Sequence, residues 1–149
     1  PVSFLKYWEN DKATKQKVKD GWLYTGDFAY KDEEGYFYFK GREDDIINTS
    51  GYRVGPSEVE DAILSHSEVS MVAVIGIPDK LRGQVIKAFV VPKDHNNVLT
   101  QNETLKNSIQ NHVKLKLAAH EYPRLIEFVY ELPLTTTGKI IRKDLRENN

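Results

Sequence analysis

A lysine that directly follows a glycine in a hydroxyl-rich segment, Thr135-Thr-Thr-Gly-Lys139, is the first residue that could do chemistry. On a polar loop, its ammonium group can reach a phosphate as a mobile point charge. The P-loop of nucleotide-binding proteins is excluded, because that motif has a glycine five residues before its Gly-Lys pair and Ser or Thr after it. Pro133 and Ile140 hold those two places here.

Two further segments, Tyr24-Thr-Gly-Asp27 and Gly41-Arg-Glu-Asp-Asp45, combine charge with glycine. The Asp27 carboxylate can accept two hydroxyl hydrogen bonds, as from a ribose. The alternative is an Asx-turn in which Asp27 caps its own loop. Arg42 could bind a phosphate or a ribose, although a solvated turn would equally explain the second segment when it is taken alone.

The first 40 residues are not expected to form a hydrophobic core of their own. Residues 1–21 contain a charged run with few apolar anchors, which indicates a solvated helix or linker. Residues 22–40 alternate aromatic and polar side chains around Lys31-Asp-Glu-Glu-Gly35, a pattern typical of a β-hairpin. One hairpin is too small to be stable alone, so we expect it to belong to a sheet whose remainder lies elsewhere.

From Gly41 onward the sequence has enough apolar residues for a core. A short hairpin is predicted around residues 48–51, followed by a helix that starts at Pro56 and turns Val59, Ala62 and Ile63 inward. Residues 71–77 and 85–91 read as strands, separated by residues 78–83.

The last third predicts a second helix, a strand and a terminal helix. Thr100 and Glu103 form a capping-box pattern, and an apolar stripe recurs every four residues after it, at Leu105, Ile109, Val113 and Leu117. Residues 125–129 form a strand, residues 135–139 a polar loop and residues 141–146 a basic helix. The predicted fold class is α+β, a small antiparallel-type sheet with flanking helices.

Four motifs occur in the order Tyr-x-Gly-Asp, Gly-Arg-x-Asp-Asp-x-Ile, Gly-Tyr-Arg-Val-Gly-Pro-x-Glu-Val-Glu and Pro-x-Thr-x-x-Gly-Lys-x-x-Arg. This order resembles the adenylate-forming family, which includes acyl-CoA synthetases, luciferases and the adenylation domains of peptide synthetases. The resemblance covers nearly all of residues 21–146. Residues 81–90, 121–124, 127–128 and 131–133 are similar to the medium-chain acyl-CoA synthetase branch.

The resemblance implies that the chain is the end of an enzyme that joins a carboxylic acid to ATP and then transfers the acyl group from acyl-AMP to CoA. Asp27 and Arg42 would bind the ribose of ATP or AMP, Asp44 would be the hinge, and Lys139 would be the catalytic cation for adenylation. Residues 1–40 would be the tail of an N-terminal domain, with its β-hairpin, 41–45 the hinge segment, and 46–149 a mobile C-terminal domain.

The resemblance also implies a CoA-binding surface. Cations and an aromatic ring suit a nucleotide diphosphate with an adenine ring, although Tyr122 and Pro123 could instead be core and turn residues, and Arg82 could pair with Asp79. The residues that match CoA-contacting positions of the medium-chain branch are Ser50, Gly51, Tyr52, Arg53, Arg82, Tyr122, Pro123 and Arg124.

Composition limits the other partners. The net charge is −1, from 21 Lys and Arg against 22 Asp and Glu, so neither nucleic acid nor an anionic membrane is an expected partner. No apolar stretch is long enough to span a bilayer, and the absence of cysteine suits the cytoplasm. The four histidines lack ligand-like spacing, so no protein-bound metal is predicted, and Mg²⁺ would arrive with ATP.

Pro1 stands where an initiator methionine would be, so we expect a fragment of a longer protein, whose N-terminal domain is a partner in catalysis. The fragment alone should be inactive, because the family's phosphate loop and its adenine and acyl pockets lie in that domain. Two alternatives remain: a peptide-synthetase type adenylation domain that delivers to a carrier protein, and a non-catalytic nucleotide-binding module.

Overall fold

The computed structural model describes residues 4–148, which form two compact units divided between Glu43 and Asp44. The N-terminal unit contains a short helix, α1 (Asp11–Lys17), and two antiparallel strand pairs. The first pair joins β1 (Val18–Lys19) to β2 (Trp22–Leu23), and the second joins β3 (Asp27–Lys31) to β4 (Phe37–Arg42). The predicted hairpin is therefore present, but it starts at Asp27, because Trp22 and Leu23 pair with β1 instead.

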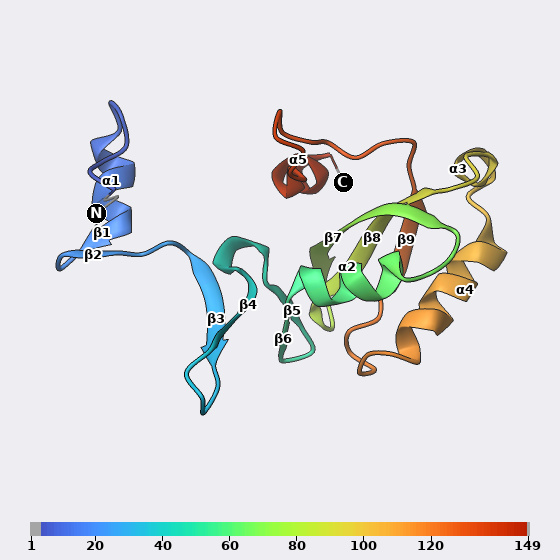
Figure 1. The fold of residues 1–149 in the computed structure, drawn as a ribbon. Coiled ribbons are helices and arrows are strands. Elements are labelled where there is room, and N and C mark those ends of the chain that lie inside the picture. The colour runs from blue at the N-terminus through green and yellow to red at the C-terminus, as the bar shows by residue number, and fades with distance from the viewer. Residues whose placement is uncertain (1–3, 149) are drawn as a thin grey trace. The chain divides into compact units, whose positions relative to one another are not determined.

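The C-terminal unit is built around a five-stranded sheet (Figure 1). A single 3₁₀ turn, η1 (Glu43–Asp45), spans the boundary between the units. Eight elements follow it in the chain: β5 (Ile47–Thr49), β6 (Tyr52–Val54), α2 (Pro56–Leu64), β7 (Val69–Asp79), β8 (Gly83–Pro92), α3 (Asn96–Thr100), α4 (Glu103–Lys114) and β9 (Leu125–Phe128). The chain ends in α5 (Arg142–Glu147).

The strands run in the order β6-β5-β8-β7, and β9 pairs with β8. All these pairings are antiparallel except that of β9 with β8, which is parallel. The predicted α+β class, with an antiparallel-type sheet and flanking helices, is confirmed, and the one parallel pairing is an addition that the sequence pattern did not indicate.

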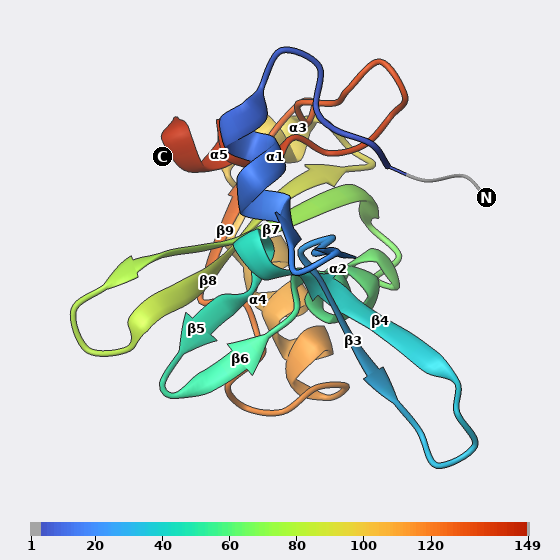
Figure 2. The same ribbon diagram turned by 90° about the vertical axis from the view of Figure 1, so that its left-hand side faces the viewer.

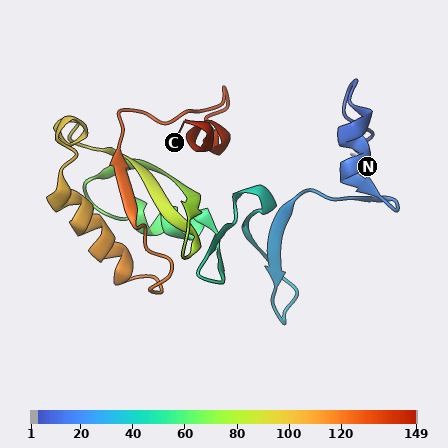
Figure 3. The same ribbon diagram turned by 180° about the vertical axis from the view of Figure 1, so that it is seen from behind.

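Both faces of the long β7–β8 ribbon are covered, because successive side chains of a strand point to opposite faces. Val72 and Val74 of β7 pack with α2 and α4 in one buried cluster. Ala73 and Ile75 join Leu145 of α5 in the other. Seen from behind, α4 and α5 lie on different sides of β8 and β9 (Figure 3). The sheet is thus a shared platform from which α5 and the loop before it are held.

The start of α4 differs from its predicted start. The N-cap is Asn102, whose side chain accepts the Leu105 N–H at 3.2 Å. Thr100 instead closes α3, its hydroxyl donating to the Asn96 carbonyl at 3.1 Å. The capping-box prediction was wrong because Asn102 competes two residues later, and asparagine is as good an N-cap as threonine or better.

The apolar stripe of α4 is confirmed at Leu105, Ile109 and Val113, all of which are buried. Leu117 packs against the same cluster but lies beyond the end of the helix at Lys114. Within residues 4–148, the structure contains no helix that is long and apolar enough to cross a membrane.

Candidate active site

Lys139 lies exposed on a closed loop between Leu134 and Ile140, which form an isolated antiparallel bridge. The Thr135 N–H donates to the Lys139 carbonyl at 2.7 Å, and the Thr135 hydroxyl accepts the Lys139 N–H at 3.0 Å. Gly138 has a φ of 81°, a left-handed conformation that glycine adopts without strain. The hydroxyl-rich segment therefore builds the loop, and the loop presents the lysine ammonium to solvent.

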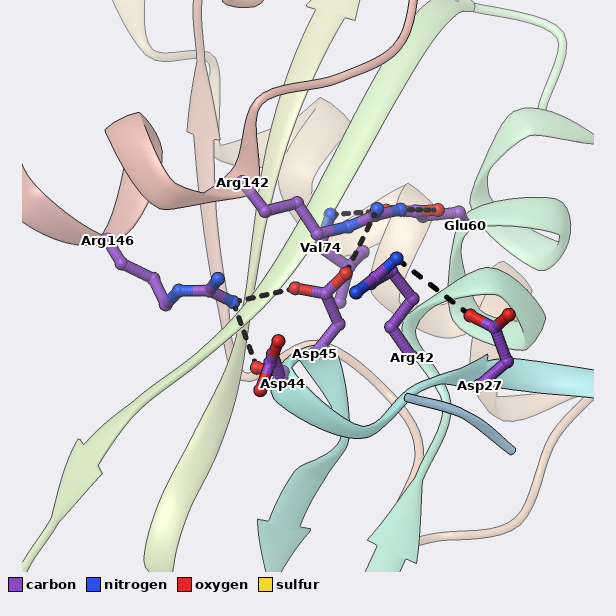
Figure 4. A network of polar contacts seen from close by, with 8 residues as sticks. All are labelled: Asp27, Arg42, Asp44, Asp45, Glu60, Val74, Arg142 and Arg146. Atoms are coloured by element: carbon purple, nitrogen blue, oxygen red, sulfur yellow. Dashed lines mark hydrogen bonds and ion pairs between the residues drawn. The ribbon is translucent and has the colours of Figure 1, made fainter. Parts of the chain in front are cut away.

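Asp27 and Arg42 face each other across the hairpin of the N-terminal unit, at the first residue of β3 and the last of β4. Arg42 Nη1 lies 3.9 Å from Asp27 Oδ1, and both side chains are about half exposed (Figure 4). The Thr25 hydroxyl accepts the Asp27 N–H at 3.1 Å. The Asp27 carboxylate is thus held beside a cation and remains accessible to a hydroxyl-bearing ligand.

A cation that the sequence reasoning missed lies close to this pair. A Cβ at Gly26 would come within 2.9 Å of Lys17 Nζ and 3.7 Å of Arg42 Nη2, so only glycine fits between them with the cations where they are. Gly26 also has a φ of 81°. The lysine-rich segment was read as a solvated helix, and nothing in its spacing pointed to Asp27.

Asp44 is exposed, belongs to η1 and is the first residue of the C-terminal unit. Its carbonyl lies 3.5 Å from Arg146 Nη1 of α5. Because β4 continues to Arg42, the strand extends two residues into the segment 41–45 that was expected to act as a hinge. The hinge role of Asp44 stays a prediction.

The eight predicted CoA contacts lie on three neighbouring segments of the C-terminal unit. The tips of the β5–β6 and β7–β8 hairpins are side by side (Figure 2), since Thr49 pairs with Gly83 and the Ser50 N–H donates to the Arg82 carbonyl at 2.9 Å. Ser50 and Gly51 have φ values of 51° and 84°, as the two central residues of a type I′ turn require. A Cβ at Gly51 would meet nothing within 4 Å, so the turn conformation, not crowding within the chain, favours glycine there.

The third segment holds Tyr122, Pro123 and Arg124. Arg124 Nη1 donates to the Tyr122 hydroxyl at 2.9 Å, and its guanidinium carbon lies 5.0 Å from the centre of that ring. Tyr122 also packs against the main core cluster, and Pro123 is buried. Tyr122 therefore has the core role that was considered for it, Pro123 is a buried residue outside any assigned turn, and Arg124 remains exposed.

Arg82 and Arg124 share a carboxylate neighbour. The pKa of Asp79 is lowered by the backbone hydrogen bonds from Arg82 and Leu81, and by the positive charges of Arg82 and Arg124. The Arg82 N–H donates to Asp79 Oδ1 at 2.8 Å. Asp79 thus stays ionised and holds the β7–β8 turn that positions Arg82.

Two residues of this surface were not predicted. His120 stacks on Tyr52, with ring centres 3.8 Å apart and an interplanar angle of 13°. Lys114, at the end of α4, places its Nζ 4.4 Å from the centre of the Tyr122 ring. The stack joins residues that are far apart in the sequence, and the Lys114 contact spans the irregular loop after α4, so no periodic pattern indicated either of them.

An ion-pair cluster surrounds Arg142, the first residue of α5 and three residues after Lys139, and we call it the Arg142 cluster (Figure 4). Arg142 Nη2 donates to both carboxylate oxygens of Glu60, at 2.8 and 2.7 Å, and Arg142 Nη1 lies 3.6 Å from Asp45 Oδ2. Arg146 Nη1 contacts Asp45 Oδ1 at 2.9 Å. The side chains of Arg142, Glu60 and Asp45 are only 20%, 14% and 13% exposed, so the cluster is largely shielded from solvent.

Among residues 4–148, no group of three or more His, Cys, Asp or Glu side chains is placed to hold a metal ion.

Comparison with known proteins identifies the family. The sequence profile described as "AMP-binding enzyme C-terminal domain" matches residues 58–139, more than half of the chain. The chain is 46% identical over 147 residues to the uncharacterized acyl-CoA ligase YtcI of Bacillus subtilis, covering 99% of this chain and 27% of that protein. It is 49% identical over 148 residues to the mitochondrial acyl-coenzyme A synthetase ACSM1 of Homo sapiens, covering 99% of this chain and 26% of that protein.

A solved structure of a CoA ligase resembles this chain as well. The anthranilate CoA ligase AuaEII, crystallised with anthranoyl-AMP, superposes with a TM-score of 0.84 at 42% identity, covering 97% of this chain and 27% of AuaEII. The resemblance to acyl-CoA synthetases is thereby confirmed. The chain spans about a quarter of the length of each of these relatives. It belongs to the AMP-binding enzyme C-terminal domain family.

Proposed function

We propose that the protein containing this chain is an AMP-forming acyl-CoA synthetase and that Lys139 is its adenylation residue. The observation that carries the proposal is the closed loop that holds Lys139 exposed, in a domain of the AMP-binding enzyme family. An exposed cation on a hydrogen-bonded loop can enter a site built by another domain. The chain's relatives that are named acyl-CoA ligases or synthetases support the same activity.

In the first half-reaction a carboxylate oxygen of the acid attacks the α-phosphorus of ATP, and pyrophosphate leaves. Charge develops on the equatorial phosphate oxygens, and a preorganised cation stabilises it. Lys139 would supply that cation. It is not needed as a base, because a carboxylic acid is already ionised at neutral pH.

Asp27 and Arg42 would orient the nucleotide during this step. A carboxylate without its own protons can accept hydrogen bonds from both ribose hydroxyls, and Arg42 lies opposite Asp27 in the register of the hairpin. Mg²⁺ is expected to enter with ATP, since magnesium sites commonly use substrate phosphates together with one or two carboxylates.

In the second half-reaction the CoA sulfur attacks the acyl carbon, AMP leaves, and the thiol proton is released. The predicted CoA surface supports this acceptor, because Arg82 lies beside the β5–β6 turn and Arg124 donates to the Tyr122 hydroxyl. The Tyr52 ring reaches the same segment, where it stacks on His120. Guanidinium groups suit pyrophosphate and aromatic rings suit adenine.

Two alternatives compete with this proposal. In the first, the acyl group goes to a carrier protein, as in peptide synthetases. In the second, the chain is part of a module that binds nucleotide and transfers nothing. We also propose a cytoplasmic location, because the chain contains no cysteine. The relative ACSM1 is named mitochondrial, so the location of this protein is to be tested by cell fractionation. The N-terminal domain of the same protein would contribute the acyl pocket. The substrate is therefore a carboxylic acid whose chain length is selected by residues outside this chain.

The test is a two-part assay of the full-length protein with a panel of carboxylic acids. We expect pyrophosphate release that depends on the acid and thioester formation that depends on CoA. Pyrophosphate release without thioester would favour a carrier-protein acceptor. ATP binding without pyrophosphate release from any acid would contradict the proposal and favour the binding module.

A further inference from the structure

The loop that carries Lys139 is stiff, so its direction depends on how its base is attached. Three backbone hydrogen bonds close it, from Thr135 to Lys139, from Gly138 to Thr135 and from Ile141 to Pro133. Apolar contacts hold the flanking chain, because Leu132 and Leu145 are buried in the cluster on the α5 side of the sheet. Such contacts are non-directional, and by themselves they do not determine where the loop points.

Arg142 supplies a directional contact at the base of this loop. It is the first residue of α5 and lies three residues after Lys139. Its guanidinium donates two hydrogen bonds to Glu60 at 2.8 and 2.7 Å. Both hydrogen bonds come from one nitrogen, Nη2, while Nη1 faces Asp45 at 3.6 Å. The guanidinium is therefore held by charge-assisted contacts on two sides, and these tie the start of α5 to α2.

Glu60 connects Arg142 to the sheet itself. The same carboxylate accepts the Val74 N–H at 2.8 Å, and Val74 lies in β7, an edge strand of the sheet. An unpaired edge amide needs an acceptor, and Glu60 fills that need while holding Arg142. The base of the Lys139 loop is therefore tied, through Glu60, to the sheet of the C-terminal unit.

Asp45 extends the cluster to the residue next to the predicted hinge. Its two carboxylate oxygens face Arg142, at 3.6 Å, and Arg146, at 2.9 Å. Arg146 also contacts the Asp44 carbonyl at 3.5 Å. Turning the unit about Asp44 would therefore carry the Lys139 loop with it, because α5 and the first residues of the unit are bound to each other.

Stability alone does not explain this cluster. A shielded ion pair loses much solvation, and well-packed apolar residues often stabilise a protein as well or better. Arg142 Nε is also buried without a hydrogen-bond partner among the described residues, which is a further cost. What the ion pairs add to the apolar packing of α5 is a directional contact at its first residue.

We propose that Arg142 is a positioning residue for Lys139, held by Glu60 and Asp45. This inference rests on the function proposed above. A misplacement of about 1 Å in a catalytic constellation can reduce the rate about 100-fold. Loss of the Arg142–Glu60 pair should therefore slow adenylation without removing any group that touches substrate.

The experiment compares Arg142→Gln, Glu60→Gln and the double variant in the full-length protein. The matched control is Lys143→Gln, which removes a cation from the adjacent, exposed position of α5. We expect Arg142→Gln to lower kcat for adenylation about 100-fold with little change in KM for ATP. Thioester formation from supplied acyl-AMP should stay near the wild-type rate, and the double variant should be no worse than Arg142→Gln, since the two residues act as a pair.

A second measurement, hydrogen exchange of residues 134–140 in the full-length variants, separates the possible failures. Faster exchange of these amides in Arg142→Gln, but not in Lys143→Gln, supports the anchoring. Unchanged exchange would overturn it whether or not the protein is active. An equal loss of both half-reactions with a lower melting temperature would overturn the positioning role in favour of a structural one, and a wild-type protein without adenylation activity would overturn the proposed function.

Discussion

Lys139 and Asp27 carry opposite charges and have opposite tasks in the proposed reaction. Lys139 is useful because it is exposed on a loop and can stabilise charge that appears only in the transition state. Asp27 lies on a strand beside Arg42, and in the proposed reaction it would bind the ribose of the nucleotide before and after adenylation. Loss of Lys139 should therefore affect kcat, and loss of Asp27 should affect the binding of ATP.

Asp27→Ala is expected to raise KM for ATP in the full-length protein about 10- to 100-fold, the effect of losing hydrogen bonds to a charged acceptor. Folding stability should change little, because the Asp27–Arg42 pair is about half exposed and such pairs contribute little. Steady-state kinetics and a thermal melt measure the two effects. Glu33→Ala, in the exposed turn of the same hairpin, is the control. A large loss of stability with unchanged KM would contradict the ribose-binding role.

Among individual residues, the sequence pointed to those that lie in local motifs and missed those defined by tertiary contact. Lys139, Asp27 and Arg42 were predicted as site residues because their segments match motifs of the adenylate-forming family in the same order. The partners of Arg142 could not be found, because Glu60 lies 82 positions away and a glutamate in a helix is normally solvated. His120 was set aside for lack of ligand-like spacing, whereas its ring stacks on Tyr52.

Helix α4 and its contacts hold one face of the sheet, and its start can be tested directly. Asn102→Ala should destabilise the C-terminal unit by about 1 kcal/mol, the usual effect of losing an N-cap side chain. Thr100→Ala should cost less, since its hydroxyl bonds only within α3. Urea unfolding followed by circular dichroism compares the two. A larger effect of Thr100→Ala would contradict Asn102 as the N-cap of α4 and would favour the capping box predicted at Thr100.

The contact between α2 and α4 should depend on pH through His66. Burial lowers the pKa of His66, the nearby His112 lowers it further, and Glu68 partly offsets this. The His66 and His112 rings are 5.2 Å apart, edge to face, and His66 Nε2 lies 3.1 Å from the Ser108 hydroxyl. Protonation therefore favours the unfolded chain, whose histidine retains its ordinary pKa of 6.5.

The direction of the pH dependence of folding stability follows from proton binding at His66. Above the unfolded pKa neither state is protonated at His66 and its contribution to stability is complete, and as pH falls towards the lower folded pKa that contribution is lost. Urea unfolding at about pH 7.5 and about pH 5.5, on either side of the ordinary histidine pKa, should show this loss. His66→Gln should reduce the difference and His95→Gln should not. A pH dependence that His66→Gln leaves unchanged would assign it to other groups.

Elements were predictable where one strong local signal was present. Pro56 marked the start of α2, and the type I′ turn residues Ser50 and Gly51 marked the β5–β6 hairpin. The start of α4 was misplaced because two adequate caps lie two residues apart. The parallel pairing of β9 was not predictable, since strand direction is set by the path of α4 and its loops and not by the strand's own residues.

The boundary between the two units is where we expect the mobile C-terminal domain to turn between the two half-reactions. The boundary lies between Glu43 and Asp44, inside η1. A short segment that absorbs changes in backbone dihedral angles is typical of a hinge. The ion pairs of the Arg142 cluster begin one residue later, at Asp45, so a rotation about the N–Cα bond of Asp44 would leave them in place.

Asp44→Pro tests the hinge, because proline fixes φ and removes the backbone N–H. In the full-length protein, one half-reaction should survive near the wild-type rate while the other is lost, since the C-terminal unit would be held in one orientation. Adenylation from acid and ATP and thioester formation from supplied acyl-AMP are measured separately. Asp44→Ala, which leaves the backbone free, should retain both. Equal loss of both half-reactions in Asp44→Pro would indicate misfolding instead.

The central claim is that Lys139 serves adenylation and leaves the site for thioester formation. Lys139→Gln removes the charge, as acetylation of this lysine would. The measurement is the pair of half-reaction rates of this variant in the full-length protein. We expect adenylation to fall about 100-fold or more and thioester formation from supplied acyl-AMP to stay near the wild-type rate. If thioester formation falls as far as adenylation, Lys139 is not the adenylation-specific residue proposed here.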